Sequence, residues 1–212
     1  MEEPVERGEA PLTHGPLTKA QARRERVIAV ARVLFAEHGF HGTGMAEIAK
    51  RSGVAVGQIY RDFANKEEIV AAIVERDLGQ FLGDAALRAA VDSCDERAIR
   101  TWITQFVTGE DEDDTTERLI AEILAESSRN ERIAAIFRTV HESLRDAIAE
   151  ALARLAPDPL KEQRRALLTE VILTISAGLF HRRLAREAQP DPTLLTALNR
   201  SIEREIDVLL AD

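Results

Sequence analysis

The sequence predicts an all-α protein of 212 residues, and three observations lead to that fold class. Apolar residues recur at three- and four-residue steps from about residue 18 onward, which is the period of an amphipathic helix. No stretch shows the sustained two-residue alternation that is typical of a half-buried strand. Prolines and short polar segments separate the periodic stretches, so that one helix ends before the next begins.

The periodic stretches predict a series of helices with short connections. Thr18 is a suitable N-cap for the first helix, and Gly39 is a suitable place for that helix to end. A longer helix is expected from about Asn65, with two acidic residues in its first turn. The other helices are expected at about 45–52, 56–62, 95–108, 115–127, 130–155, 160–188 and 192–210.

The first part of the chain differs in composition from the rest. Residues 1–18 are rich in Pro, Gly and Glu without periodicity, and we expect a disordered tail there. This segment lacks the basic and apolar regions of a secretory signal, and no apolar run reaches the roughly 18 residues of a membrane span. With Cys94 as the single cysteine, no internal disulfide can form. These features favour a cytoplasmic protein without membrane contact.

Charge is distributed unevenly along the chain. The net charge is −9, which by itself does not suggest binding to nucleic acid. Residues 19–66, however, hold nine Lys or Arg against four Asp or Glu, whereas residues 67–212 hold 18 against 29. A basic segment followed by an acidic body is expected of a DNA-binding module joined to a domain that does not bind DNA.

Two short helices joined by a tight glycine turn are the sequence pattern of a helix-turn-helix. Ala49 is small where the two helices would cross, and Gly53 lies in the turn. A bulky residue at 49 would separate the helices, and a β-branched residue at 53 would resist a positive φ. The apolar face of the unit is expected to comprise Ile48, Val54, Ile59 and Phe63.

The outer surface of the second short helix is left with polar, small and cationic residues. A helix of this size fits the major groove, where Gln, Tyr and Arg side chains can reach bases or phosphates. The flanking helices would support it, and phosphates would neutralise its cations. The outward positions are Val56, Gly57, Gln58, Tyr60, Arg61 and Asp62.

The run "GFHGTGMAEIAKRSGVAVGQIYRDFANKEEIVAAI" resembles the N-terminal domain of the TetR family of bacterial transcriptional regulators. The resemblance covers about a quarter of the chain and implies a homodimer that binds a palindromic operator and leaves it when a small molecule binds. The matching features are Gly39-Phe40, Thr43, "IAKRSGV", Gly57, Ile59-Tyr60, Phe63 and Lys66-Glu67.

The resemblance also implies roles for individual residues. Thr43, Tyr60 and Lys66 match positions that contact phosphate, and the positions that approach bases are matched by Val56, Gly57 and Gln58. Two residues depart from the family pattern. Gly44 stands where a second Thr or Ser is common, so one phosphate hydrogen bond is expected to be missing. Asp62 stands where His is common, and its charge would repel phosphate unless Arg61 or another cation pairs with it.

We expect the DNA-binding domain to span residues 19–65 and a ligand-binding and dimerisation domain to span residues 66–212. Aromatic residues make up only 4% of the chain, so the few large or switchable side chains of the second domain are candidates for a ligand pocket. Core packing is the alternative for each of them. The candidates are Trp102, Phe106, Phe137, His141, Phe180 and His181.

The last two helices are the expected dimer interface, as a four-helix bundle formed with a second copy. One apolar stripe lies on the final helix, and another lies on the helix before it beside the small residues Ser176, Ala177 and Gly178. The alternative is that both stripes face the protein's own core. The stripes are Leu195, Leu198, Ile202, Ile206 and Leu209, and Val171, Ile175 and Leu179.

Other patterns do not indicate chemistry. In "HESLR" at 141–145 the second histidine of a zinc-protease helix is replaced by Arg145, and the acidic run Glu110–Asp114 reads as a solvated loop. We therefore expect no enzyme activity, metal or cofactor. Two hypotheses remain: a ligand-responsive repressor, or a regulator of the same fold that is controlled by a partner protein.

Overall fold

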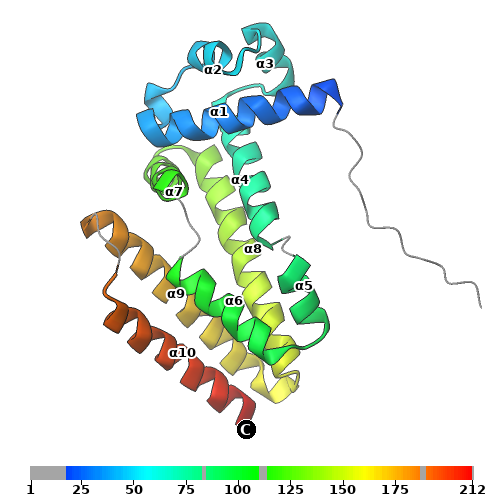
Figure 1. Cartoon of the computed structure of the whole chain (residues 1–212), viewed down its shortest axis with the longest axis vertical. Helices are drawn as coiled ribbons and strands as arrows, with labels where there is room; N and C mark the ends of the chain where they lie inside the picture. Colours follow the sequence, from blue (N-terminus) through cyan, green and yellow to red (C-terminus); the bar gives the residue numbers. More distant parts are fainter. Residues whose placement is uncertain (1–17, 83–84, 110–113, 187–189, 212) are drawn as a thin grey trace, which may run out of the picture.

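The computed structural model describes residues 18–82, 85–109, 114–186 and 190–211. These residues form ten α-helices and one 3-10 helix, with no strand among them (Figure 1). The predicted all-α fold is confirmed. The helices are α1 (Lys19–Gly42), α2 (Met45–Ser52), α3 (Val56–Asp62), α4 (Lys66–Leu82), α5 (Ala85–Asp92), α6 (Glu96–Thr108), α7 (Asp114–Ser127), α8 (Glu131–Leu155), α9 (Glu162–Arg186) and α10 (Pro192–Ala211), with the 3-10 helix η1 (Pro159–Lys161) before α9.

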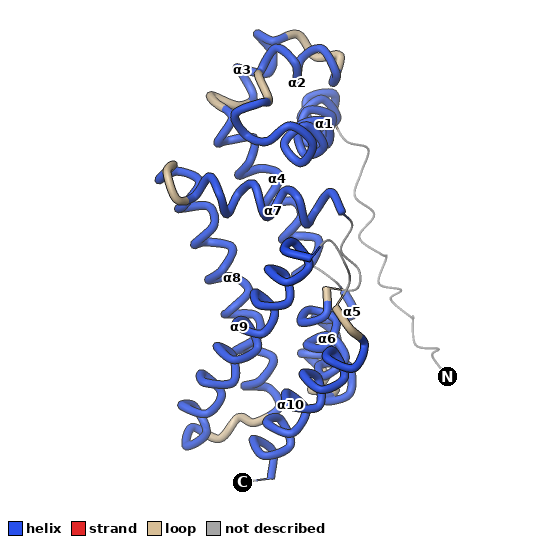
Figure 2. Tube along the Cα trace, turned by 90° about the vertical axis from the view of Figure 1, so that its left-hand side faces the viewer, coloured by secondary structure: helices blue, strands red, loops and turns tan. Residues whose placement is uncertain are grey.

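The molecule is elongated, and its two ends are built from different helices. Helix α1 lies across one end with α2 and α3 on its outer side, while α4 and α8 lead away toward the other end (Figure 1). Helices α5, α6 and α9 pack against the far part of α8, and α10 packs against α6 and α9 (Figure 1). Helix α7 passes beneath α1 and crosses it (Figures 1 and 2).

Local sequence signals set the ends of the first helices. The Thr18 hydroxyl accepts from the Gln21 N–H, and the Gln21 side chain accepts from the Thr18 N–H, which is a capping box. The regular helix breaks at Gly39, whose φ is 73°, and one further turn completes α1. Gly53 ends α2 with a φ of 65°, in the left-handed region that glycine adopts without strain.

Most predicted helix boundaries agree with the structure to within about two residues. Helix α5 had not been predicted, and the η1 turn occupies the start of the stretch expected to be helical from residue 160. The expected disordered tail, apart from Thr18, and residues 110–113 of the acidic run lie outside the described residues. Among the described helices, none is both long enough and apolar enough to cross a membrane.

The first hydrophobic core joins the helix-turn-helix to more distant helices. Its α1–α4 members include Phe35, Ile48, Ile59 and Phe63, each at most 1% exposed. The same core continues into α7 and the start of α8, through Leu119, Ile123 and Ile133. Apolar packing is therefore continuous across residue 65, where the boundary between the two domains is expected. The division into two domains remains a prediction.

The second core fills the far end of the molecule. It joins α5, α6, the second half of α8, α9 and α10. Ile202, Ile206 and Leu209 of α10 are at most 3% exposed within it, and Leu195 and Leu198 pack against it. For these three residues the alternative holds, because this chain's own core buries them, whereas Leu195 and Leu198 are only partly buried. On α9, Leu179 is buried as well, whereas Val171 is 36% exposed.

Candidate nucleic-acid interface

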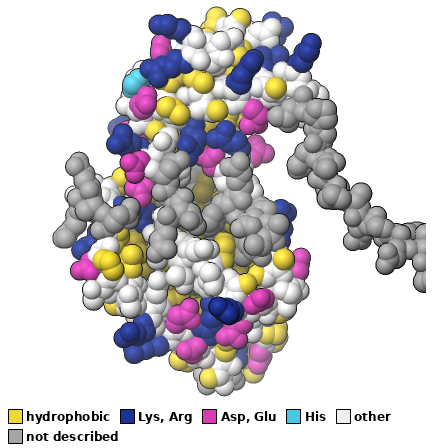
Figure 3. Space-filling model, in the orientation of Figure 1, with side chains coloured by type: hydrophobic (Ala, Val, Ile, Leu, Met, Phe, Trp, Pro, Cys, Tyr) yellow, Lys and Arg dark blue, Asp and Glu magenta, His cyan; other side chains and the backbone are white. Residues whose placement is uncertain are grey.

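The outer face of α3 is open to solvent, as the sequence predicts. Val56 is 45% exposed and Tyr60 is 54% exposed, whereas Ile59 between them is fully buried. Gly57 and Arg61 are also exposed, and Gln58 is half-buried. Several Lys and Arg side chains lie over the end of the molecule that α1–α3 form (Figure 3). A short helix with polar, small and cationic groups facing outward has the shape and chemistry for a DNA groove.

The turn between α2 and α3 is held by backbone hydrogen bonds. The Ala49 carbonyl accepts from the N–H groups of Gly53 and Val54. The Ala55 carbonyl then starts α3 by accepting from Gln58 and Ile59, at 2.8 and 3.2 Å. The left-handed conformation of Gly53 and this tight bonding together set the angle between the two short helices.

Asp62, at the end of α3, is paired with a cation from α1. Arg23 donates to both carboxylate oxygens, with its Nε 2.8 Å from Oδ2 and its Nη2 2.9 Å from Oδ1. Hydrogen bonding to Arg23 is the main reason that the pKa of Asp62 lies below its ordinary value. Arg24 adds a bond of 3.2 Å from Nη1 to the Asp62 carbonyl and lies 4.3 Å above the centre of the Phe63 ring. The pairing cation is therefore Arg23, which sequence reasoning did not single out.

The polar groups of Thr43 and Lys66 bond to main-chain carbonyls of this chain. Thr43 is fully buried, and its hydroxyl lies 3.0 Å from the Leu34 carbonyl oxygen and 2.9 Å from that of Gly39. The Lys66 ammonium donates to the carbonyls of Phe40 and Thr43, at 2.6 and 3.0 Å. Both side chains hold the end of α1, and a phosphate contact by either of them remains a prediction. Gly44, at the N-cap of α2, is exposed.

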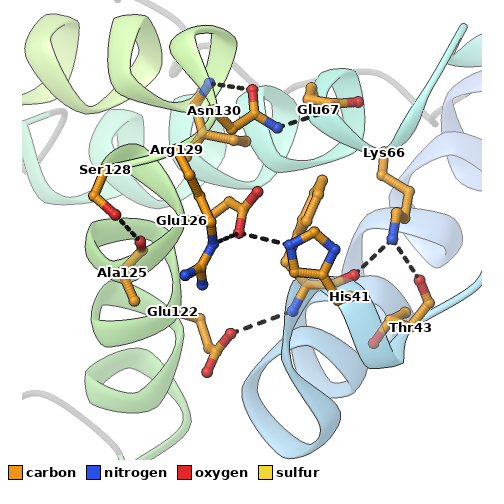
Figure 4. Close-up of polar contacts among 12 residues, drawn as sticks. His41, Thr43, Lys66, Glu67, Glu122, Ala125, Glu126, Ser128, Arg129 and Asn130 are labelled. Atoms are coloured by element: carbon orange, nitrogen blue, oxygen red, sulfur yellow. Dashed lines mark hydrogen bonds and ion pairs between the residues drawn. The ribbon is translucent and has the colours of Figure 1, made fainter.

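Two glutamates of α7 hold the last turn of α1 (Figure 4). Glu122 Oε2 accepts from the Phe40 N–H at 3.3 Å, and Glu126 Oε2 lies 2.9 Å from His41 Nε2. Glu126 is only 4% exposed and is also paired with Arg129 at 2.9 Å. Burial alone would raise the pKa of Glu126, but the bond to Arg129 and the nearby cations outweigh it and lower that pKa.

The kink at Gly39 gives these contacts their geometry. A Cβ at this position would lie 2.9 Å from Glu122 Oε2, so the glycine lets α7 approach α1 closely. The start of α4 is joined to the start of α8 in the same region, by a bond of 3.1 Å from Asn130 Nδ2 to Glu67 Oε1 (Figure 4). The junction therefore links the helix-turn-helix to helices of the C-terminal part through directed polar contacts.

Sequence reasoning also missed Glu122 and Glu126. A signal was present, because both acids lie on the same face of α7 as the apolar residues Leu119 and Ile123. Carboxylates on a buried stripe need partners, and the partners here come from α1 and from Arg129 in the turn between α7 and α8.

The six candidate pocket residues do not gather around one cavity. Trp102 and Phe106 stack with ring centres 6.0 Å apart in the second core, whereas Phe137 packs against the first core. Phe180 lies 5.9 Å from the Arg183 guanidinium, and His141 and His181 are exposed. A cavity of about 10 Å³, with room for about one water, lies at the α1–α7 junction. It is lined by Phe35, Phe40, Val70, Leu119, Glu122, Ile123, Glu126 and Ile133.

A further buried polar contact joins three helices of the C-terminal part. Arg183 of α9 is 6% exposed, and its Nε lies 2.5 Å from Glu117 Oε1 of α7. Its Nη1 also donates to the Thr108 carbonyl at the end of α6, at 3.0 Å. Among the described residues, no group of three or more His, Cys, Asp or Glu is placed to hold a metal ion.

The fold and the exposed short helix define a helix-turn-helix DNA-binding protein. Residues 27–73 match the family of bacterial regulatory proteins known as the tetR family. The chain is 28% identical over 177 residues to the HTH-type transcriptional regulator UidR of Escherichia coli K12, covering 81% of this chain and 88% of that one. Residues 27–73 are therefore a DNA-binding domain of the TetR family of transcriptional regulators, as the sequence motif indicated.

Solved structures share the same architecture over nearly the whole chain. GusR of Salmonella enterica superposes with a TM-score of 0.68 at 23% identity, covering 90% of this chain and 98% of that one. FadR of Bacillus subtilis, in complex with stearoyl-CoA, gives a TM-score of 0.65 at 20% identity, covering 88% and 97%. At these identities the likeness establishes the fold.

Proposed function

We propose that this protein is a transcriptional repressor that binds a palindromic operator as a homodimer and is released by a small molecule. It would act in the bacterial cytoplasm. The proposal is carried by one observation: an exposed helix-turn-helix face whose supporting helix, α1, is bonded directly to α7. A change that shifts α7 would therefore move the last turn of α1 and the start of the helix-turn-helix.

We assign direct DNA contacts to the exposed part of the predicted set. Gln58, with Val56 and Gly57 beside it, would approach bases, while Tyr60 and Arg61 would reach phosphates. Gly44 would leave the N-terminus of α2 open to a phosphate. Thr43 and Lys66 would act by holding the end of α1 in place, since their polar groups bond to its carbonyls.

The homodimer is assigned to the outward face of α9, with α10 beside it. Leu167 is 66% exposed, and Val171, Leu184 and the α10 residue Val208 are each 36–39% exposed. Exposed Ala177 and Gly178 lie on the same helix and would allow close approach of a second copy. Leu167→Glu combined with Val171→Glu should give a monomer with weak operator binding, while Leu160→Glu, at a 92% exposed position before α9, is the matched control. A double variant that sediments as a dimer would place the interface elsewhere.

The effector is proposed to bind in the second core near Trp102 and Phe106. Because these rings stack on each other, an effector would have to separate them or displace them. The same packing favours the alternative that a partner protein, rather than a small molecule, controls the regulator. Acyl-CoA thioesters are a reasonable first class to screen, since FadR of Bacillus subtilis forms a complex with stearoyl-CoA.

The test begins with selection of operator DNA from random duplexes by the purified full-length protein. A gel shift on the selected duplex, repeated with stearoyl-CoA and with a panel of metabolites, should then show release by at least one compound. That compound should also raise the Tm of the protein. Selection that yields no preferred sequence would contradict the proposed function, and binding that no compound reverses would favour control by a partner protein.

A further inference from the structure

The proposed function does not explain why an acidic residue lies on α3, the helix that is proposed to approach the bases. Asp62 is the last residue of α3 and its side chain is 18% exposed. A carboxylate so close to a surface that would face phosphates weakens DNA binding if it acts as an isolated charge. We therefore expect Asp62 to have a role that favours DNA binding and offsets this repulsion.

The geometry of the Asp62 pair supplies that role. Arg23 meets the carboxylate with two parallel hydrogen bonds, of 2.8 and 2.9 Å, which fix orientation as well as distance. Arg23 lies in the first turns of α1, and Asp62 lies 39 residues later, so the pair ties the end of α3 to a different helix. The Arg23 side chain is 26% exposed, so the pair is shielded in part from water.

Arg24 reinforces the same attachment at a second point. Its Nη1 donates to the main-chain carbonyl of Asp62, and its guanidinium covers the ring of Phe63. A cation at the C-terminus of a short helix also interacts favourably with the helix dipole. Arg23 and Arg24 of α1 thus contact Asp62 and Phe63 at the end of α3. The contacts are hydrogen bonds to the Asp62 side chain and main chain and the packing of Arg24 on the Phe63 ring.

We propose that Arg23 and Asp62 are a positioning pair, which sets the orientation of α3 on α1 and thereby both the affinity and the base preference of the protein for its operator. The proposal rests on the assignment of α3 as the helix that enters the groove. It makes Asp62 a residue that favours DNA binding although its charge is repulsive, and it gives Arg23 a function that does not depend on touching DNA.

Asp62→Asn distinguishes this proposal from independent charges because the two views predict opposite signs. If the charges act independently, removing the carboxylate should tighten operator binding. If the pair positions α3, the same change should weaken binding by about tenfold and broaden the base preference at the positions that α3 reads. Arg23→Ala should weaken binding to a similar extent.

Two further variants separate positioning from net charge. Arg23→Lys keeps the charge but loses the bidentate hydrogen bonding to Asp62. If the pair positions α3, operator binding by this variant should therefore still be weaker than that of the wild type. The double variant Arg23→Ala with Asp62→Asn should bind no more weakly than Arg23→Ala alone, because both changes break one pair. Glu47→Gln is the matched control, since Glu47 lies on α2 and its bond to Arg51, at 2.9 Å, stays within that helix.

The measurements are operator affinity over a range of salt concentrations, base preference by repeated selection, and Tm to confirm folding. Tighter or unchanged binding by Asp62→Asn, or wild-type affinity in Arg23→Lys, would overturn the proposal while leaving the proposed function intact. If Asp62→Asn does not fold, the Arg23→Lys result decides. A wild-type protein without any operator preference would overturn the proposed function and this inference together.

Discussion

The two ends of α1 are attached to the rest of the molecule by opposite chemistry. At the N-terminal end, α1 supplies two guanidinium groups that bind the end of α3. At the C-terminal end, α1 supplies main-chain groups and His41, which are held by acids of α7 and by Lys66 of α4. The first attachment is made by half-buried side chains at the end of α3, whereas the second includes the buried carboxylate of Glu126. Changes at the C-terminal end should therefore affect stability most, and changes at the N-terminal end should affect DNA recognition most.

The largest effect is expected at the kink of α1. Gly39→Val places a β-branched residue at a φ of 73° and pushes its Cβ against Glu122. We expect a loss of about 1–3 kcal/mol of unfolding free energy, which corresponds to a Tm lower by roughly 3–10 °C. Gly79→Ala is the control, because a Cβ there meets nothing within 4 Å and its helix should be unchanged or slightly more stable. An unaltered Tm for Gly39→Val would show that the kink does not anchor α1.

The next largest effect is expected at Lys66. Lys66→Ala removes both hydrogen bonds to the end of α1 and the contact of 4.4 Å with the Phe40 ring. Thermal unfolding should show a loss of about 1–2 kcal/mol. The salt dependence of operator binding should stay unchanged if the ammonium serves α1, whereas a phosphate contact would lower the slope by about one. Lys50→Ala, at an exposed position on α2, is the control for stability.

A smaller and pH-dependent effect is expected at Glu126. Since the pKa of its carboxyl is lowered in the folded protein, its stabilising contribution is present above the pKa of the unfolded chain and is lost as pH falls through the folded pKa. Glu126→Gln should therefore lower the Tm at pH 7, and the difference from wild type should shrink from about pH 5 downward. Glu131→Gln, whose side chain is 83% exposed, should show no such difference. A difference in Tm that does not change with pH would mean that the charge of Glu126 does not contribute to stability.

The smallest effect is expected at His41. Its side chain is 70% exposed, so the bond to Glu126 is screened by water although the carboxylate itself is buried. His41→Gln should change the unfolding free energy by no more than about 0.5 kcal/mol. Combined with Glu126→Gln, it should add nothing further, because both changes remove the same bond. A larger loss in chemical denaturation would show that His41 holds the junction by itself.

Local features of the fold could be predicted from sequence because short segments determine them. The cap at Thr18, the turn at Gly53 and the apolar residues of the helix-turn-helix depend on neighbours within a few positions. The outward face of α3 follows from the same periodicity once Ile59 is placed inside. Apart from Thr18, these positions also lie within the segment that matches the TetR family.

Contacts between distant segments could not be predicted in the same way. Periodicity shows that α10 has an apolar face, but it does not show whether this chain or a second copy covers that face, and Ile202 and Ile206 prove to be internal. Arg23 and Asp62 are 39 residues apart, and Glu122 lies 82 residues from Phe40. Only the three-dimensional packing of α1 on α3 and α7 brings these groups together.

The extension of the first core into α7 and α8 bears on how DNA-binding units could be exchanged between regulators. Leu119, Ile123 and Ile133 complete the packing around α1 and α4, so a fragment cut at residue 65 or at residue 82 would expose apolar surface that these residues cover. A chimera that joins this helix-turn-helix to another regulator's C-terminal helices would have to carry matching side chains at those three positions. We therefore expect a portable DNA-binding unit of this protein to be discontinuous in sequence, and exchange of the N-terminal segment alone to give a less stable protein.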